Sequence, residues 1–139
     1  MKLKPIKMKK SIYSVVVLMM SLFIFIFCSA DDGFENARYY VKYEVNSNSD
    51  YGVSTNQSIK YTSENGIEIF SQEGKHVRSL KWEGTYGPFK KGDAISLFVS
   101  NSIMKIHARI YVSRDKEPFV IKAEDTQNKI LSLEYQIDF

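Results

Sequence analysis

The chain has 139 residues, a length that favours one domain over two, and 44% of them are hydrophobic. Its formal net charge is +3 at pH 7, but this sign depends on five lysines among the first ten residues. Without these five lysines the chain has 14 basic and 16 acidic residues, a net charge of −2. This balance excludes a basic nucleic-acid-binding surface as the main feature of the remaining residues.

The N-terminal segment combines this basic start with an apolar run. Residues Ile12 to Phe27 contain no charged side chain, and the run is shorter than the ~20 residues that a bilayer-spanning helix needs. This layout is typical of a secretory signal. We therefore predict a signal peptide over residues 1–27, with a permanent membrane anchor helix as the alternative.

The only cysteine of the chain, Cys28, directly follows the apolar run, and alone it cannot form an intramolecular disulfide. The stretch Cys28-Ser-Ala-Asp-Asp-Gly33 resembles bacterial lipoprotein signals, in which this cysteine carries a lipid and begins the mature protein. The resemblance implies a lipid anchor at Cys28, a polar tether over residues 28–37 and an outer-membrane location. Phe27 is larger than the residue usual before such a cysteine. Cleavage after Ala30, which would give a secreted or periplasmic protein, is the alternative.

The remainder, residues 38–139, alternates apolar and polar residues with the period of a β-strand. The clearest segment is Met104 to Val112, where Ile106, Ala108 and Ile110 share one face. The predicted strands are 38–45, 58–62, 67–71, 76–83, 94–100, 104–112, 118–123 and 131–139. About eight short strands without a helical pattern predict an all-β fold, an antiparallel two-sheet β-sandwich of the immunoglobulin-like type.

Polar and glycine-rich segments predict the connections between these strands. Asn65 and Gly66 form the strongest hairpin signal, because both residues accept positive φ. A change of phase between Val77 and Leu80 predicts a β-bulge near Arg78 and Ser79. The other predicted connections are residues 46–55, 72–75, 84–93, 114–116 and 125–128.

A family resemblance follows from the strand motifs Arg38-Tyr-Tyr-Val-Lys-Tyr-Glu-Val45, Leu80-Lys-Trp82 and Glu117-Pro-Phe119. In this order they resemble the small exported sandwich domains of Bacteroidetes-type lipoproteins. More distantly, the chain is similar to the periplasmic domain of the small mycobacterial membrane proteins that accompany lipid transporters. The resemblance covers nearly all of residues 38–139 and implies a binding or accessory role at the cell envelope. Its motifs are structural, so it implies no catalytic residue.

The sequence contains no catalytic or metal-binding pattern. The two histidines, His76 and His107, lack partners at metal-ligand spacing, and no Gly-x-Ser-x-Gly elbow or phosphate-binding glycine motif occurs. Neighbouring carboxylates lie in the predicted tether and turns, where acidic residues are ordinary: Asp31 and Asp32, Asp115 and Glu117, and Glu124 and Asp125. We therefore predict a protein that is not an enzyme and that has no cofactor and no metal.

Aromatic residues are the best candidates for ligand or partner contact. Trp82, Tyr86 and Phe89 cluster around the glycine-rich segment 84–93, where their rings could stack on a sugar or a peptide side chain. The alternative is that they fill one end of the sandwich core. A second candidate contact surface is an outer face that carries Tyr40, Phe98 and Tyr111. The alternative is that these three rings are ordinary aromatic residues scattered over the surface.

These observations together predict a non-enzymatic lipoprotein of the cell envelope that acts as a binding or accessory module. Its expected partners are a membrane, through the lipid anchor, and an envelope protein or glycan, but no nucleic acid. Two alternatives remain open: an envelope enzyme that acts on glycan, and a subunit that docks into a larger envelope assembly through a strand edge or its outer aromatic face.

Overall fold

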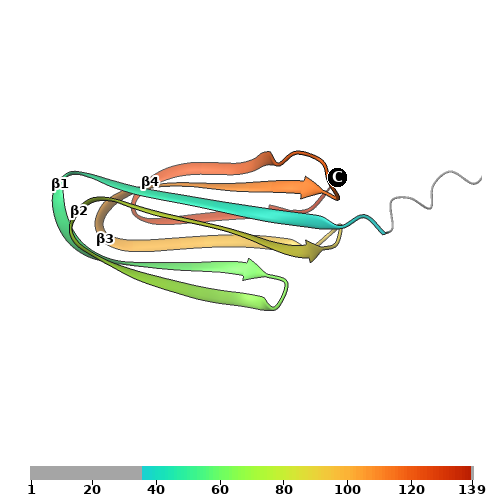
Figure 1. The fold of residues 1–139 in the computed structure, drawn as a ribbon, viewed down its shortest axis with the longest axis horizontal. Helices are drawn as coiled ribbons and strands as arrows, with labels where there is room; N and C mark the ends of the chain where they lie inside the picture. The colour runs from blue at the N-terminus through green and yellow to red at the C-terminus, as the bar shows by residue number, and fades with distance from the viewer. Residues whose placement is uncertain (1–35, 139) are drawn as a thin grey trace, which may run out of the picture. The chain divides into compact units, whose positions relative to one another are not determined.

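The computed structural model describes residues 36–138, which form an all-β fold. Its four long strands are β1 (Tyr39–Ser63), β2 (Gly66–Phe89), β3 (Ala94–Arg114) and β4 (Val120–Gln136). They form one antiparallel sheet in the order β2-β1-β3-β4, so β1 and β3 are central and β2 and β4 are the edges (Figure 1). The predicted all-β antiparallel class is confirmed.

The predicted signal peptide, the lipid-anchor cysteine Cys28 and most of the predicted tether precede residue 36. They lie outside the described residues. Within residues 36–138, the structure contains no helix with the length and apolar character needed to cross a bilayer.

The sheet bends in the middle of every strand and folds back on itself, as Figure 1 shows. Pairing between β1 and β3 stops at Asn48 and Lys105 and resumes at Ser58 and Ser100. Two residues at the bend, His76 in β2 and Lys129 in β4, have φ angles of 55° and 68°, which is a left-handed conformation typical of bulges. We call residues 39–48, 79–89, 105–114 and 120–128 half-sheet A. Residues 55–63, 66–74, 94–100 and 130–136 are half-sheet B.

The core lies between the two halves of this folded sheet. Tyr43 in half-sheet A donates a hydrogen bond of 2.6 Å from its hydroxyl to the carbonyl oxygen of Thr62 in half-sheet B. The ring of Tyr43 lies 5.8 Å from that of Tyr61, also in half-sheet B. Most of the predicted inward faces are confirmed as buried: Tyr39, Val41, Tyr43, Val45, Ile59, Tyr61, Ile95, Leu97, Val99, Ile106, Ala108, Ile110, Val112, Leu131, Leu133 and Ile137. Tyr135, on the predicted inward face of the last strand, is only half-buried.

The structure differs from the prediction in strand number and in sheet number. It has four continuous strands in a single sheet, where the sequence predicted about eight short strands in two sheets. Each pair of predicted strands is one long strand that bends. Segments 46–55, 72–75 and 125–128, predicted as connections, are parts of β1, β2 and β4, and β2 also continues through most of 84–93.

The physical reason is that a bend interrupts the register without ending the strand. The polar segment that begins at Asn46 has the composition of a loop, yet Asn46 pairs with Lys81 on one side and with His107 on the other. Asparagine and serine weaken the intrinsic strand preference, but up to Asn48 pairing with two neighbours supplies the hydrogen bonds that keep the backbone extended. Beyond it, β1 pairs again with β2 at Val53 and Thr55.

Two predicted turns agree with the structure, whereas the predicted bulge lies on a different strand. A turn at Glu64 and Asn65 joins β1 to β2, and Gly66 has a φ of 112°, which residues with side chains rarely adopt. A second turn follows Arg114. Near Arg78 and Ser79, where a bulge is predicted, the pairing of β1 with β2 shifts register. The shift lies between the pairs Val53↔Val77 and Asn48↔Ser79, and the extra residues are on β1 and not on β2.

Candidate functional site

The structure gathers the predicted aromatic group against the core. Trp82 and Tyr86 are half-buried and lie 5.0 Å and 4.7 Å, respectively, from the ring of Tyr61. Phe70 of half-sheet B stacks on Trp82 at 5.9 Å. Phe89, the third predicted contact residue, is itself a buried member of the core. Much of the surface of these three rings is therefore used in packing between the two half-sheets.

The second predicted aromatic group does not form a single surface. Tyr40 and Tyr111 lie on the outer side of half-sheet A, because they alternate with the buried residues of β1 and β3. Phe98 lies on the outer side of half-sheet B, beside Lys60. The inner sides of the two halves pack against each other, so their outer sides point in opposite directions.

Asp31 and Asp32 lie outside the described residues, and the other histidine and carboxylate candidates form no metal centre within residues 36–138. Among residues 36–138, no group of three or more histidine, cysteine, aspartate or glutamate side chains could hold a metal ion. Asp115 accepts a hydrogen bond from the backbone nitrogen of Arg38 at 3.0 Å, which ties the start of β1 to the turn after β3. Asp125 accepts bonds from Thr126 and Gln127. His76 lies at the bend of β2.

A ladder of charged side chains crosses the outer side of half-sheet A. Glu44, Arg109 and Glu124 stand in register on β1, β3 and β4. Arg109 Nε lies 2.7 Å from Glu124 Oε1, and Lys42 Nζ lies 2.7 Å from Glu44 Oε1. His107 Nε2 lies 3.0 Å from Glu124 Oε1. Alternation along one strand places each residue outward, but only the register between strands brings them together.

These contacts shift the pKa values of both carboxylates in the same direction. The hydrogen bond from Arg109 lowers the pKa of Glu124 below its ordinary value of 4.5. Hydrogen bonds from Lys42 and then from the hydroxyl of Tyr111 lower the pKa of Glu44. Each charge is matched by an opposite one, so the ladder has the character of a structural surface network.

We expect the stability of the domain to fall as the pH drops below about 4.5. A carboxylate with a lowered pKa in the folded state stabilises the fold above its unfolded-state pKa of 4.5, and this contribution is lost as the pH falls through the folded-state value. Glu44→Gln combined with Glu124→Gln should therefore reduce the difference in melting temperature between pH 7 and pH 3. The control is Glu134→Gln, on β4 outside the ladder. An equal pH dependence in both variants would contradict this assignment.

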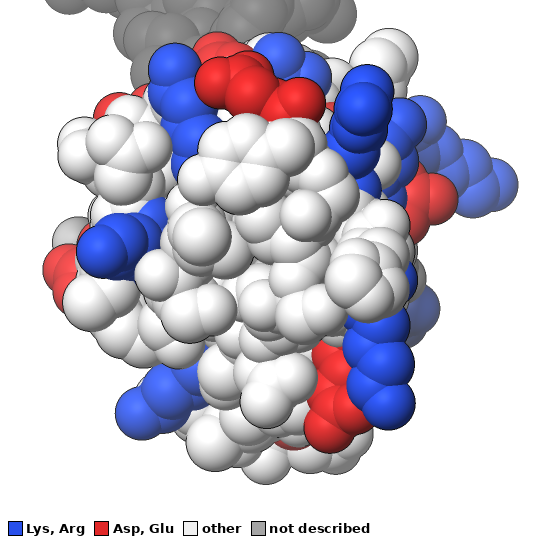
Figure 2. Space-filling view, turned by 90° about the vertical axis from the view of Figure 1, so that its left-hand side faces the viewer, with Lys and Arg blue, Asp and Glu red and all other residues white. Residues whose placement is uncertain are grey.

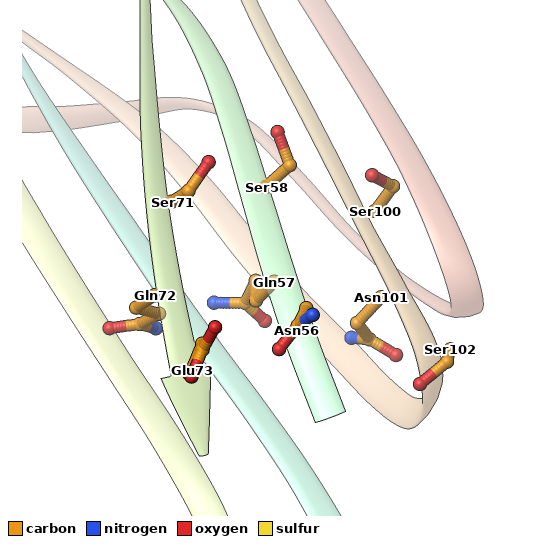
Figure 3. A pocket seen from close by; sticks show the side chains of 9 residues that line it. All are labelled: Asn56, Gln57, Ser58, Ser71, Gln72, Glu73, Ser100, Asn101 and Ser102. Atoms are coloured by element: carbon orange, nitrogen blue, oxygen red, sulfur yellow. The ribbon is translucent and has the colours of Figure 1, made fainter. Parts of the chain in front are cut away.

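A polar hollow of about 570 Å³ lies across three neighbouring strands of half-sheet B, next to the bend. Each strand contributes one short polar segment, and Figure 3 shows their side chains on β2, β1 and β3. The lining residues are Asn56, Gln57, Ser58, Ser71, Gln72, Glu73, Ser100, Asn101 and Ser102. The register places Ser58 between Ser71 and Ser100 in a row across the sheet.

The hollow coincides with the place where the main-chain ladder between β1 and β3 is interrupted. Beyond the pair of Ser58 and Ser100 this ladder stops, and a side-chain bond of 2.9 Å between the hydroxyls of Thr55 and Ser102 links the strands instead. The bend therefore leaves room at the surface where a continuous ladder would have closed it.

Two amide residues next to the outward side chains of this hollow are buried on the inner side of the sheet. Gln57 is 1% exposed, and its Oε1 accepts a bond from the hydroxyl of Ser47. Asn101 is 9% exposed, and its Oδ1 accepts bonds from the backbone nitrogens of Met104, at 2.8 Å, and Ile103, at 3.1 Å. Within the described part of the chain, the amide nitrogens of both residues have no hydrogen-bond partner. Both residues alternate with the outward Ser58 and Ser100, so their amide groups point to the inner side of the sheet.

The sequence carries a signal of the hollow that side-chain alternation alone does not reveal. The segments 56–58, 71–73 and 100–102 are three tripeptides built only of serine, asparagine, glutamine and glutamate. Such residues are typical of turns, and each of the three segments includes the end residue of a predicted strand. Recognising a site would have required the register that places the three tripeptides side by side.

The function of this chain has to be argued from its own residues, because comparisons with known proteins find no match. Searches against protein-family models, curated proteins and solved structures find no match to it.

Proposed function

We propose that the protein is a non-enzymatic binding module of the bacterial cell envelope. The observation that carries the binding role is the polar hollow on the outer side of half-sheet B, where hydroxyl, amide and carboxylate side chains of three strands lie together (Figure 3). The row of Ser71, Ser58 and Ser100 and the exposed side chains of Asn56 and Glu73 supply hydrogen-bond donors and acceptors. A ligand with matching polar groups would bind there through these side chains.

The N-terminal sequence supports the place of action that we propose. A basic start, an uncharged run from Ile12 to Phe27 and Cys28 immediately after it favour export and a lipid on Cys28. A lipid anchor would hold the β domain at a membrane, with the outer membrane as the proposed location. We also propose that the two half-sheets act as an immunoglobulin-like sandwich, in which each half of a long strand corresponds to one strand of the sandwich.

We expect Cys28→Ala to abolish lipid attachment and membrane association. Cells that express the protein and are fed an alkyne-labelled palmitate should incorporate the label into the wild-type chain. The variant should lack it, because Cys28 is the only cysteine and therefore the only thiol. Cys28→Ser, which keeps a small polar residue, serves as the matched variant and should also be unlabelled. An unmodified mature terminus at Asp31 in mass spectrometry would instead indicate cleavage after Ala30 and remove the lipid from the proposal.

The alternative of a docking subunit is favoured by one observation, the apolar residues on the edge strands. Ile67 and Ile69 on β2, and Val120 and Ile121 on β4, are exposed on the two strands that have a free edge within the described sheet. Exposed edges of this kind can pair with another chain. Light scattering that gives the mass of a monomer, together with cross-linking that captures no envelope protein, would remove this alternative.

A further inference from the structure

We propose that the polar hollow next to the bend binds a neutral carbohydrate. This inference rests on the binding role proposed above and names the chemical class of its ligand. It follows from the balance of hydrogen-bonding groups in the hollow, from the exposed phenylalanine beside it, and from its position on a sheet face.

The lining side chains match a ligand rich in hydroxyl groups. The exposed side-chain amide of Asn56 can both donate and accept hydrogen bonds. The hydroxyls of the serine row can donate and accept, and the carboxylate of Glu73 can only accept. A sugar hydroxyl is both donor and acceptor, so one ring can satisfy all three kinds of group.

The charge of the hollow argues against an anionic ligand. Glu73 is the one charged residue among the nine that line it, and no lysine or arginine is present there to bind a phosphate or a carboxylate. Figure 2, which views the bend end, shows that uncharged residues occupy its centre while charged side chains surround it. A neutral ligand would avoid both repulsion by Glu73 and the desolvation of an unpaired charge.

An aromatic ring lies on the same side of the sheet as the serine row. Phe98 is 38% exposed and stands two residues before Ser100 on β3, so both side chains point outward. Two residues along a strand correspond to about 7 Å, which places the ring within reach of a second sugar unit. The face of an aromatic ring packs against the apolar face of a sugar, and the hydroxyl edges remain for the polar groups of the hollow.

The position of the hollow favours a sugar over an extended peptide. A peptide that binds a β protein commonly adds to a free strand edge, where main-chain groups are unpaired. The hollow instead lies over the face of β2, β1 and β3, and its centre is the central strand β1. Recognition there must use side chains, as sugar binding does.

The experiment is a titration of the ¹⁵N-labelled full chain in detergent with four neutral hexasaccharides: cellohexaose, maltohexaose, laminarihexaose and N-acetylchitohexaose. We expect at least one of them to cause saturable chemical-shift changes centred on the backbone amides of residues 56–58, 71–73 and 100–102. Glu73→Gln should raise the Kd about tenfold, as expected for the loss of a hydrogen bond to a charged group. Phe98→Ala should raise it about fivefold through the lost stacking.

Two control variants make the same chemical changes outside the hollow. Glu83→Gln alters a carboxylate on the same strand but in half-sheet A, and Phe119→Ala removes another exposed ring. Both should leave the Kd unchanged. Equal weakening by Glu73→Gln and Glu83→Gln would place binding elsewhere and overturn the assignment.

The remaining outcomes separate this inference from the proposed function. No shift with any of the four sugars at millimolar concentration would overturn the carbohydrate assignment. Saturable shifts at the hollow with a serine- and asparagine-rich peptide, but not with the sugars, would also overturn it while the binding role would stand. Loss of lipid labelling at Cys28 has no bearing on the hollow and would contradict only the anchored location.

Discussion

Ile110→Asp is expected to abolish the folded domain. Ile110 is fully buried at the centre of β3, where it pairs with Tyr43 of β1 and Ala123 of β4. An unpaired carboxylate in this position would lose its hydration without gaining a partner, at a cost comparable to the ~5–15 kcal/mol that stabilises a typical domain. Circular dichroism should show no cooperative thermal transition, and size-exclusion chromatography should show no soluble monomer.

The neighbouring substitution Arg109→Ile provides the matched control. Arg109 differs by one position along β3 and therefore points to the outer side, where it contacts Glu124 and Glu44. Removal of partly exposed ion pairs costs at most about 1 kcal/mol after solvent screening. If thermal melts ranked Arg109→Ile as the more damaging of the two, the assignment of inner and outer faces would be wrong.

Tyr43→Ala is expected to destabilise the domain by about 3–5 kcal/mol, the range for removal of a large buried aromatic side chain. The ring of Tyr43 is fully buried and contacts Tyr61 of the opposite half-sheet and Trp82 of the adjacent strand. Its loss would leave a cavity between the two half-sheets and remove the bond to the carbonyl oxygen of Thr62. Urea unfolding monitored by tryptophan fluorescence would measure the change, because Trp82 is the single tryptophan.

Two further variants separate the contributions of the ring and the hydroxyl. Tyr43→Phe keeps the ring but removes the donor to Thr62, and it should cost about 1–2 kcal/mol. Tyr51→Ala, at the bend where the side chain is 62% exposed, should change stability by less than about 0.5 kcal/mol. Similar losses for Tyr43→Ala and Tyr51→Ala would mean that the two halves of β1 do not pack on each other in solution.

The outer charged ladder and the polar hollow show two different uses of the same sheet. In the ladder, Arg109 lies between Glu44 and Glu124, and the groups satisfy one another. In the hollow, the serine row and the exposed side chains of Asn56 and Glu73 point to the outer surface. The difference arises because the ladder lies where strands β1, β3 and β4 are in continuous register, whereas the hollow lies where the register is interrupted.

Much of the fold could be predicted from side-chain alternation. The alternation in Met104 to Val112 correctly gave the buried face of β3, and the pair Asn65 and Gly66 correctly gave the hairpin between β1 and β2. Both signals are local: a strand has a period of two whatever it pairs with, and a tight turn needs residues that accept positive φ.

The number of strands could not be predicted in the same way. The segment that begins at Asn46 is as polar as a loop, and nothing in its own composition shows that Lys81 and His107 lie on either side of it. Whether such a segment ends a strand or bends it depends on the hydrogen bonds offered by its neighbours. Those neighbours are distant in sequence, so only the folded chain determines the outcome.

The sequence by itself determined the class of the fold, the faces of its strands and the layout typical of an exported protein, because each depends on residues close together in the chain. Only the tertiary structure decided that the four strands bend at a common level. That bend brings the tripeptides 56–58, 71–73 and 100–102 together and leaves the nitrogens of Gln57 and Asn101 without partners among the described residues. The reason is register: the alignment of one strand against the next is set by the packing of the whole inner face.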